Sequence, residues 1–151
     1  MGYIICDSAP ANWGKTTTLL EVAKLFKSNQ SLYTISSPKT INGIDEWLVV
    51  KVKATNKIII VQTQGDNASA FQDTENYLKR TKNPVDIIIC ASRSSGNSYQ
   101  KVLDIANSYG YKRIMFSNFC PMDRTLFSNT TISQVNLVDL APIIVKFAIS
   151  L

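Results

Sequence analysis

The sequence has no histidine and only three cysteines among its 151 residues. Without histidine, acid–base catalysis by imidazole and metal binding through imidazole nitrogens are excluded. Cys6, Cys90 and Cys120 form no C-x-x-C pair, and the first two lie in apolar, strand-like runs. We therefore expect these cysteines to be small core residues of a reduced, cytoplasmic protein, without disulfide or metal-binding roles.

Long hydrophobic runs are also absent. The apolar stretch 143–151 is interrupted by Lys146 and is too short to span a bilayer, so we expect a packed helix there and no transmembrane segment. Met1 and Gly2 lead directly into the first apolar run at 3–6, so we expect no secretory leader. The sequence thus favours a cytoplasmic location.

Dense runs of one charge are missing as well. The formal net charge is +5, but the 16 basic and 11 acidic residues are dispersed along the chain, which gives no clear nucleic-acid signal. With 45% hydrophobic and 18% charged residues, the length and composition predict one globular domain over 1–151.

The most informative stretch that is present lies between an apolar run and a predicted helix. It matches the phosphate-loop pattern G-x-x-x-x-G-K-[ST], with Ala9 in place of the first glycine. Downstream, Leu19, Val22 and Phe26 recur at helical spacing, so the match occupies the strand-to-helix junction that its mechanism requires. The predicted nucleotide-binding residues are Ala9, Pro10, Ala11, Asn12, Trp13, Gly14, Lys15, Thr16 and Thr17.

Each residue type in this loop has a chemical reason. Backbone N–H groups and the helix N-terminus attract a phosphate anion, and Gly14 permits its close approach. Lys15 would contact the outer phosphates, and the Thr16 hydroxyl would be a ligand of Mg²⁺.

The apolar run 57–61 is a predicted buried strand, joined to 46–53 in a hairpin. In many phosphate-loop proteins the strand beside the loop ends in an aspartate that orients the Mg²⁺ shell, but Gln62 holds that position here. Asp66 is the nearest carboxylate, and we expect it to position metal or water, unless it only caps the following helix. Gln62 or Gln64 is a weaker candidate for orienting a water molecule.

A second buried strand, 85–91, ends in the polar loop 92–97, which contains Arg93. Ligands of open α/β folds bind at this edge of the sheet, so Arg93 is a candidate contact for a nucleotide phosphate, a substrate phosphate or an acidic partner.

Three further positions are weaker candidates for the predicted nucleotide site. Thr40 lies in a predicted polar loop, 38–43, and Arg124 lies in a long connection, 121–133, that resembles a flap. Asn118 occurs without the rest of a guanine-recognition motif. A last helix near 140–151, with Pro142 in its first turn, would cover the sheet.

These elements predict a three-layer α/β/α sandwich around a mostly parallel sheet with one β-hairpin. The motifs A-x-x-x-x-G-K-T, I-I-I-V-Q-T-Q-G-D-N and D-I-I-I-C-A-S-R-S-S-G resemble those of small single-domain P-loop NTPases, and of a poorly characterised group of short bacterial P-loop proteins in particular. The resemblance covers roughly residues 3–117 and implies nucleotide binding.

Three functions agree with these residues. The first is Mg²⁺-dependent hydrolysis of a nucleoside triphosphate, with ATP as the first candidate. Lys15, Asp66 and Arg93 would be the catalytic residues, and Thr16 and Asp66 would bind the metal. The alternatives are a small-molecule or nucleotide kinase and a nucleotide-dependent switch without strong turnover. A protein partner or self-association is compatible with each of them.

Overall fold

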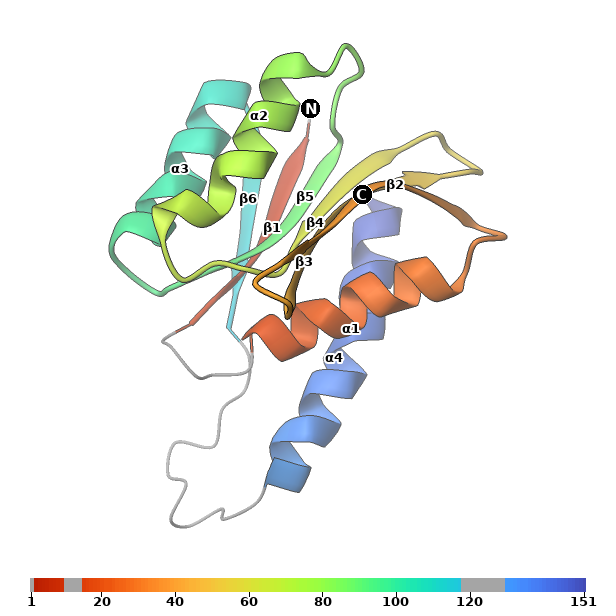
Figure 1. Cartoon of the computed structure of the whole chain (residues 1–151), viewed down its shortest axis with the longest axis vertical. Helices are drawn as coiled ribbons and strands as arrows, with labels where there is room; N and C mark the ends of the chain where they lie inside the picture. The colour runs from red at the N-terminus through yellow and green to blue at the C-terminus, as the bar shows by residue number, and fades with distance from the viewer. Residues whose placement is uncertain (1, 10–14, 118–129) are drawn as a thin grey trace.

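The computed structural model describes residues 2–9, 15–117 and 130–151, with the backbone alone described for 130–139. Six strands and four α-helices make up this part of the chain (Figure 1). The strands are β1 (Tyr3–Ser8), β2 (Tyr33–Ile41), β3 (Asp45–Val52), β4 (Ile58–Gln62), β5 (Ile87–Ser92) and β6 (Lys112–Phe116). The helices are α1 (Lys15–Ser28), α2 (Gln72–Arg80), α3 (Asn97–Tyr109) and α4 (Thr130–Ser150), with the short 3₁₀ helix η1 (Ala68–Phe71) before α2.

The strands form one sheet in the order β2-β3-β4-β5-β1-β6. β1 pairs in parallel with β5 and β6, and β4 pairs in parallel with β5, whereas β3 is antiparallel to both of its neighbours. The predicted α/β class with a mostly parallel sheet is confirmed. The shared strand direction places the carboxyl ends of β1, β4, β5 and β6 at one edge of the sheet.

Helices cover both faces of the sheet, with α1 and α4 on one side and α2 and α3 on the other (Figure 1). Strand side chains alternate between the two faces, so each strand contributes to two cores. On β1, Ile5 belongs to the core beneath α1 and α4, and Ile4 and Cys6 belong to the core beneath α2 and α3. The near-continuous apolar sequences of β4 and β5 follow from burial on both faces.

The structure corrects three expectations at the periphery. Thr40 lies in β2, paired with Glu46, rather than in a loop, so the sheet has two consecutive hairpins, β2–β3 and β3–β4, instead of one. α4 begins at Thr130, earlier than predicted, and Pro142 is therefore inside the helix rather than in its first turn. The spacing of apolar residues in the sequence did not by itself indicate this longer helix.

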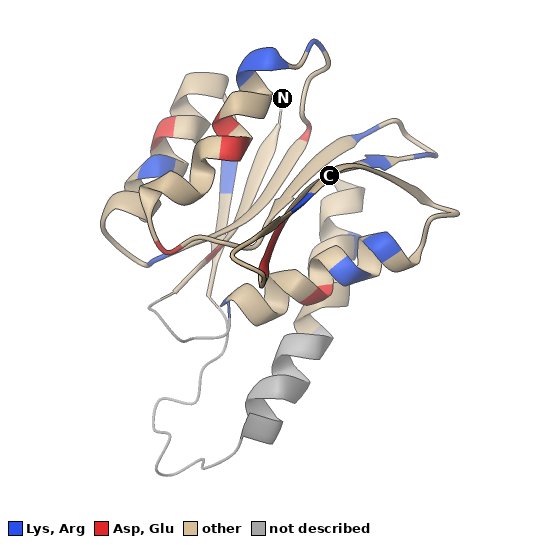
Figure 2. Ribbon diagram, viewed as in Figure 1, with Lys and Arg blue, Asp and Glu red and all other residues tan. Residues whose placement is uncertain are grey.

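Basic side chains are spread over the sheet and over helices on both of its faces (Figure 2). No helix among the described residues is long and apolar enough to cross a membrane.

The core beneath α1 depends on Phe26, which is fully buried and packs edge-on against Tyr33 with ring centroids 4.9 Å apart. We expect Phe26→Ala to lower the free energy of unfolding by about 3–5 kcal/mol, because it leaves a cavity in a closely packed core. Phe147→Ala is the matched control, since Phe147 is 41% exposed, and it should cost less than about 1 kcal/mol. Urea unfolding of both variants tests this difference, and equal losses would contradict it.

Candidate functional site

The candidate site lies where β1 and β5 end side by side. Ser8 and Ser92 are register partners, and the Ala9 amide donates to the Ser92 carbonyl over 3.2 Å. The Ser8 hydroxyl donates to the Arg93 carbonyl over 3.1 Å. These bonds attach the start of the predicted phosphate loop to the loop that follows β5.

Lys15 is the first residue of α1 and is only 5% exposed. Its Nζ donates a 2.7 Å hydrogen bond to the carbonyl of Ala9, the residue at the other end of the predicted loop. Burial lowers the pKa of Lys15 from its ordinary value, the charges of Asp66 and Asp7 oppose this shift, and Arg93 adds to it. All three charged groups are therefore within electrostatic reach of the Lys15 ammonium.

The sequence-based prediction missed Asp7. It is fully buried near the end of β1, two residues after Ile5, so it faces the α1 side of the sheet. A carboxylate at this position adds negative charge beside Lys15. The available signal was a charged residue in an otherwise apolar strand directly before the loop motif, because buried charges are rare without a specific role.

Asp66 reaches this edge by a different route from the one expected. β5 lies between β4 and β1, so the strand that ends in Gln62 is not beside the loop strand. The chain after β4 crosses the end of β5 at Gly65, where a Cβ would lie 2.1 Å from the Ala91 carbonyl oxygen. Only glycine permits this approach, and the crossing brings Asp66 toward Lys15.

Gln62 has a structural role, not the proposed water-orienting one. Its neighbour Val61 faces α1 and α4, so Gln62 faces α2, where its Oε1 accepts a 2.7 Å hydrogen bond from Thr74. Its Nε2 donates to the Gln64 carbonyl over 2.9 Å, and the side chain is fully buried. Gln64 itself is half-buried, and nothing places its side chain at the site.

Asp66 is exposed and does not cap the following helix, because Asn67 caps η1 by accepting from the Ala70 amide. Asp66 and the exposed Arg93 line one pocket of about 430 Å³, and Asn67 and residues 94–98 complete its lining. Two of the three predicted catalytic side chains, those of Asp66 and Arg93, thus line one cavity.

The remaining predicted residues divide by location. Thr16 is half-buried and Thr17 is exposed in the first turn of α1, and Ala9 is buried. Cys6 and Cys90 are buried, free and adjacent across β1 and β5, as expected for core residues. Residues that lie outside the described part of the chain are Pro10, Ala11, Asn12, Trp13, Gly14, Asn118, Cys120 and Arg124.

The residue types agree with the predicted Mg²⁺. No cluster of three His, Cys, Asp or Glu side chains suited to a metal occurs among the described residues. Magnesium, however, is usually held by one or two carboxylates, substrate phosphates and water, without a cage of protein ligands. Asp66, the buried Asp7 and the Thr16 hydroxyl are hard oxygen donors of this kind, located on elements that meet at the site.

Comparison of the chain with models of protein families, with characterised proteins and with solved structures found no match.

The close approach at Gly65 predicts a specific effect of one added methyl group. Gly65→Ala forces backbone movement against Ala91, so we expect a loss of about 1–3 kcal/mol in the free energy of unfolding. Gln64→Ala places an alanine at the preceding, half-buried position and should have a much smaller effect. Chemical denaturation of the two variants gives the comparison, and wild-type stability of Gly65→Ala would show that the crossing tolerates a side chain.

Proposed function

We propose that the protein binds a nucleoside triphosphate with Mg²⁺ at the loop between β1 and α1 and hydrolyses it, with ATP as the first candidate. The observation that carries this proposal is the position and burial of Lys15. Its buried ammonium lies at the junction of a parallel strand and a helix N-terminus and bonds back to the first residue of the loop. An ammonium with lowered pKa gains strongly from a polyphosphate, because the added negative charge compensates for its burial.

Each neighbouring group has a role in this proposal. Lys15 and the amides of the first turn of α1 would offset the charge that develops on the phosphates. Thr16, Asp66 and Asp7 are the residues that would hold Mg²⁺, which when bound would polarise the phosphate oxygens. Arg93 adds a positive charge beside Asp66.

Two observations favour the alternative functions. Because Gln62 is committed to Thr74 and Gln64, the strand-end carboxylate that often supports turnover is replaced by a structural amide. This favours a nucleotide-dependent switch with weak turnover. The pocket between Asp66 and Arg93 favours a kinase instead, because it offers room and charge for a phosphoryl acceptor.

Lys15→Ala tests nucleotide binding directly. We expect the affinity for ATP with Mg²⁺, measured by calorimetry, to fall by about 10- to 100-fold, because a hydrogen bond to a charged group contributes about 1.5–3 kcal/mol. Lys24→Ala is the matched control, since it removes the same charge from an exposed position of the same helix. Equal affinity of Lys15→Ala and wild type would overturn the proposal.

Asp66→Asn separates turnover from binding. If Asp66 positions the metal or water, phosphate release from ATP should fall by about tenfold or more while ATP still binds. Asp104→Asn, an exposed change on α3, should leave the rate unaltered. A wild-type protein that binds ATP without releasing phosphate would support the switch, and a phosphorylated acceptor from a panel of nucleosides would support the kinase.

A further inference from the structure

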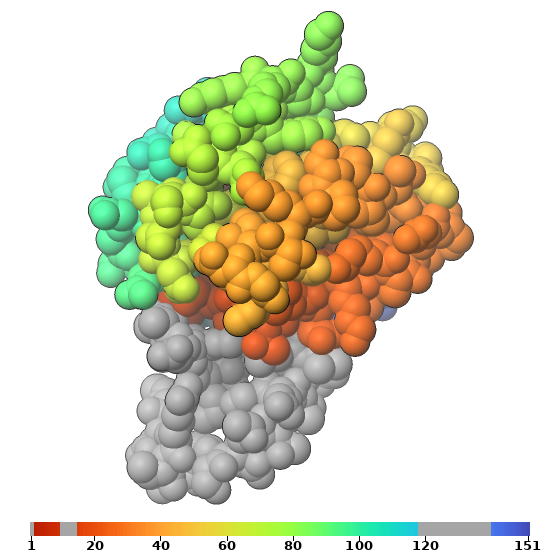
Figure 3. All heavy atoms as spheres, in the orientation of Figure 1, coloured from red at the N-terminus to blue at the C-terminus, as the bar shows by residue number. Residues whose placement is uncertain are grey.

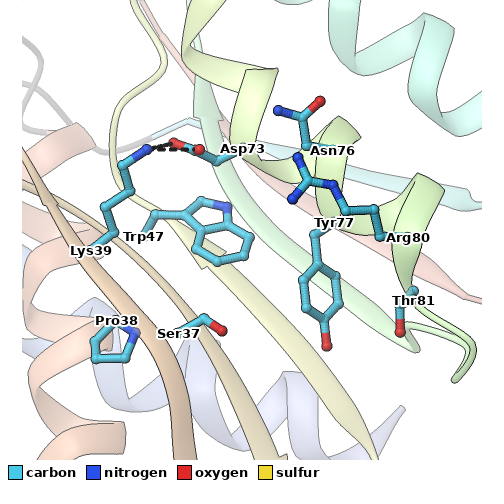
Figure 4. Close-up of a pocket in the computed structure, with 9 residues that line it drawn as sticks. All are labelled: Ser37, Pro38, Lys39, Trp47, Asp73, Asn76, Tyr77, Arg80 and Thr81. Atoms are coloured by element: carbon cyan, nitrogen blue, oxygen red, sulfur yellow. Dashed lines mark hydrogen bonds and ion pairs between the residues drawn. The ribbon is translucent and has the colours of Figure 1, made fainter.

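A second cavity, of about 530 Å³, lies between the β2–β3 hairpin and α2, on elements that meet on the face shown in Figure 3. Trp47 and Tyr77 form its aromatic wall, with ring centroids 5.8 Å apart. Trp47 lies between Lys39, which is paired with Asp73, and Tyr77, and Arg80 is next to Tyr77 on the same helix (Figure 4). The volume is typical of a small-molecule site.

The cleft contains two basic side chains, and among the described residues only one of them is paired with a carboxylate. Lys39 contacts both oxygens of Asp73, at 2.8 and 3.0 Å. Among the described residues, by contrast, no ion pair involves Arg80, which is exposed at the end of α2. A guanidinium beside aromatic rings favours a planar ligand that carries an anionic group.

Irregular backbone at the β2 edge of the cleft limits what can bind there. The register of β2 against β3 shifts between Ser36 and Lys39, and Ser37 has a left-handed backbone with a φ of 51°. Pro38 has no amide to donate. These features oppose the addition of a further strand from another chain, so they favour a small molecule over an extended peptide.

A buried chain of hydrogen bonds connects the cleft with the candidate site. The Trp47 indole donates to the Thr74 hydroxyl over 2.9 Å, Thr74 donates to Gln62, and Gln62 donates to the Gln64 carbonyl. Gln64 directly precedes Gly65, where the chain crosses β5 and leads to Asp66. This chain of bonds links the indole to the segment that carries Asp66.

We propose that this cleft binds a small aromatic anion, with Arg80 holding its anionic group, and that its occupancy is coupled to nucleotide binding through Trp47, Thr74 and Gln62. The coupling rests on the proposed function, whereas binding in the cleft does not.

The first experiment tests the cleft without nucleotide. Indole-3-acetate is the probe, and ¹H–¹⁵N NMR of the full chain follows the Trp47 indole N–H, which a Trp13→Phe variant distinguishes from the other tryptophan. We expect a saturable shift with indole-3-acetate and weaker effects of neutral indole and of acetate. Arg80→Ala should weaken binding by about tenfold or more, whereas Lys82→Ala, a nearby exposed lysine outside the cleft, should not.

Several results would overturn the cleft assignment. They are the absence of a saturable shift, equal binding of indole, and equal affinity of Arg80→Ala and wild type. A glutamate-rich peptide that binds in preference to indole-3-acetate would identify a protein partner and would overturn the small-molecule site.

The second experiment repeats the titration with saturating ATP and Mg²⁺. We expect the dissociation constant of indole-3-acetate to change by about fivefold or more. The change should persist in Thr74→Ser, which keeps the hydroxyl, and disappear in Thr74→Val, once the NMR spectrum shows that each variant is folded. An unchanged constant overturns the coupling. Failure of wild type to bind ATP overturns both the coupling and the proposed function, while the cleft is decided by the first titration alone.

Discussion

The close contact between Gly65 and the backbone of Ala91 is the constraint on which the candidate site depends. β5 separates β4 from β1, so the residues after β4 reach the loop strand only by crossing the end of β5. A side chain at Gly65 would occupy the space of the Ala91 carbonyl. The crossing therefore gives Asp66 a position near Lys15 that strand order alone would have denied it.

The electrostatics of the site arise from burial rather than from a high density of charge. Lys15 loses solvation in the first turn of α1, and Asp7 is buried on the same side of the sheet. Asp66 and Arg93 remain exposed, on two loops that follow neighbouring strands. This division leaves one buried pair of charges and one exposed pair, and only the buried pair is strongly influenced by a low local dielectric.

Much of this arrangement was predictable from the sequence, because the apolar runs of β1, β4 and β5 and the helical spacing of α1 are local signals. Strand polarity places Lys15, Asp66 and Arg93 at one edge of the sheet, since each residue comes after or beside a parallel strand, but the approach of Asp66 to Lys15 also requires the crossing at Gly65. What was not predictable depends on pairing between distant segments. The insertion of β5 beside β1, the pairing of Thr40 in β2 and the side of the sheet that Gln62 faces have no signature in their neighbouring residues. Asp7 was detectable in principle but was hidden within an apolar run.

The hydrogen bond from Lys15 to the Ala9 carbonyl gives the buried ammonium a partner within the predicted loop itself. An ammonium has three N–H donors, so under the proposed function a phosphate would share Lys15 with this carbonyl or replace it. In the ligand-free protein the carbonyl provides a hydrogen-bond partner for the buried charge. Under the proposed function, a neutral or weakly anionic ligand would gain less from Lys15 than a polyphosphate would. The same short contact would then contribute both to the stability of the ligand-free protein and to the selectivity of the site.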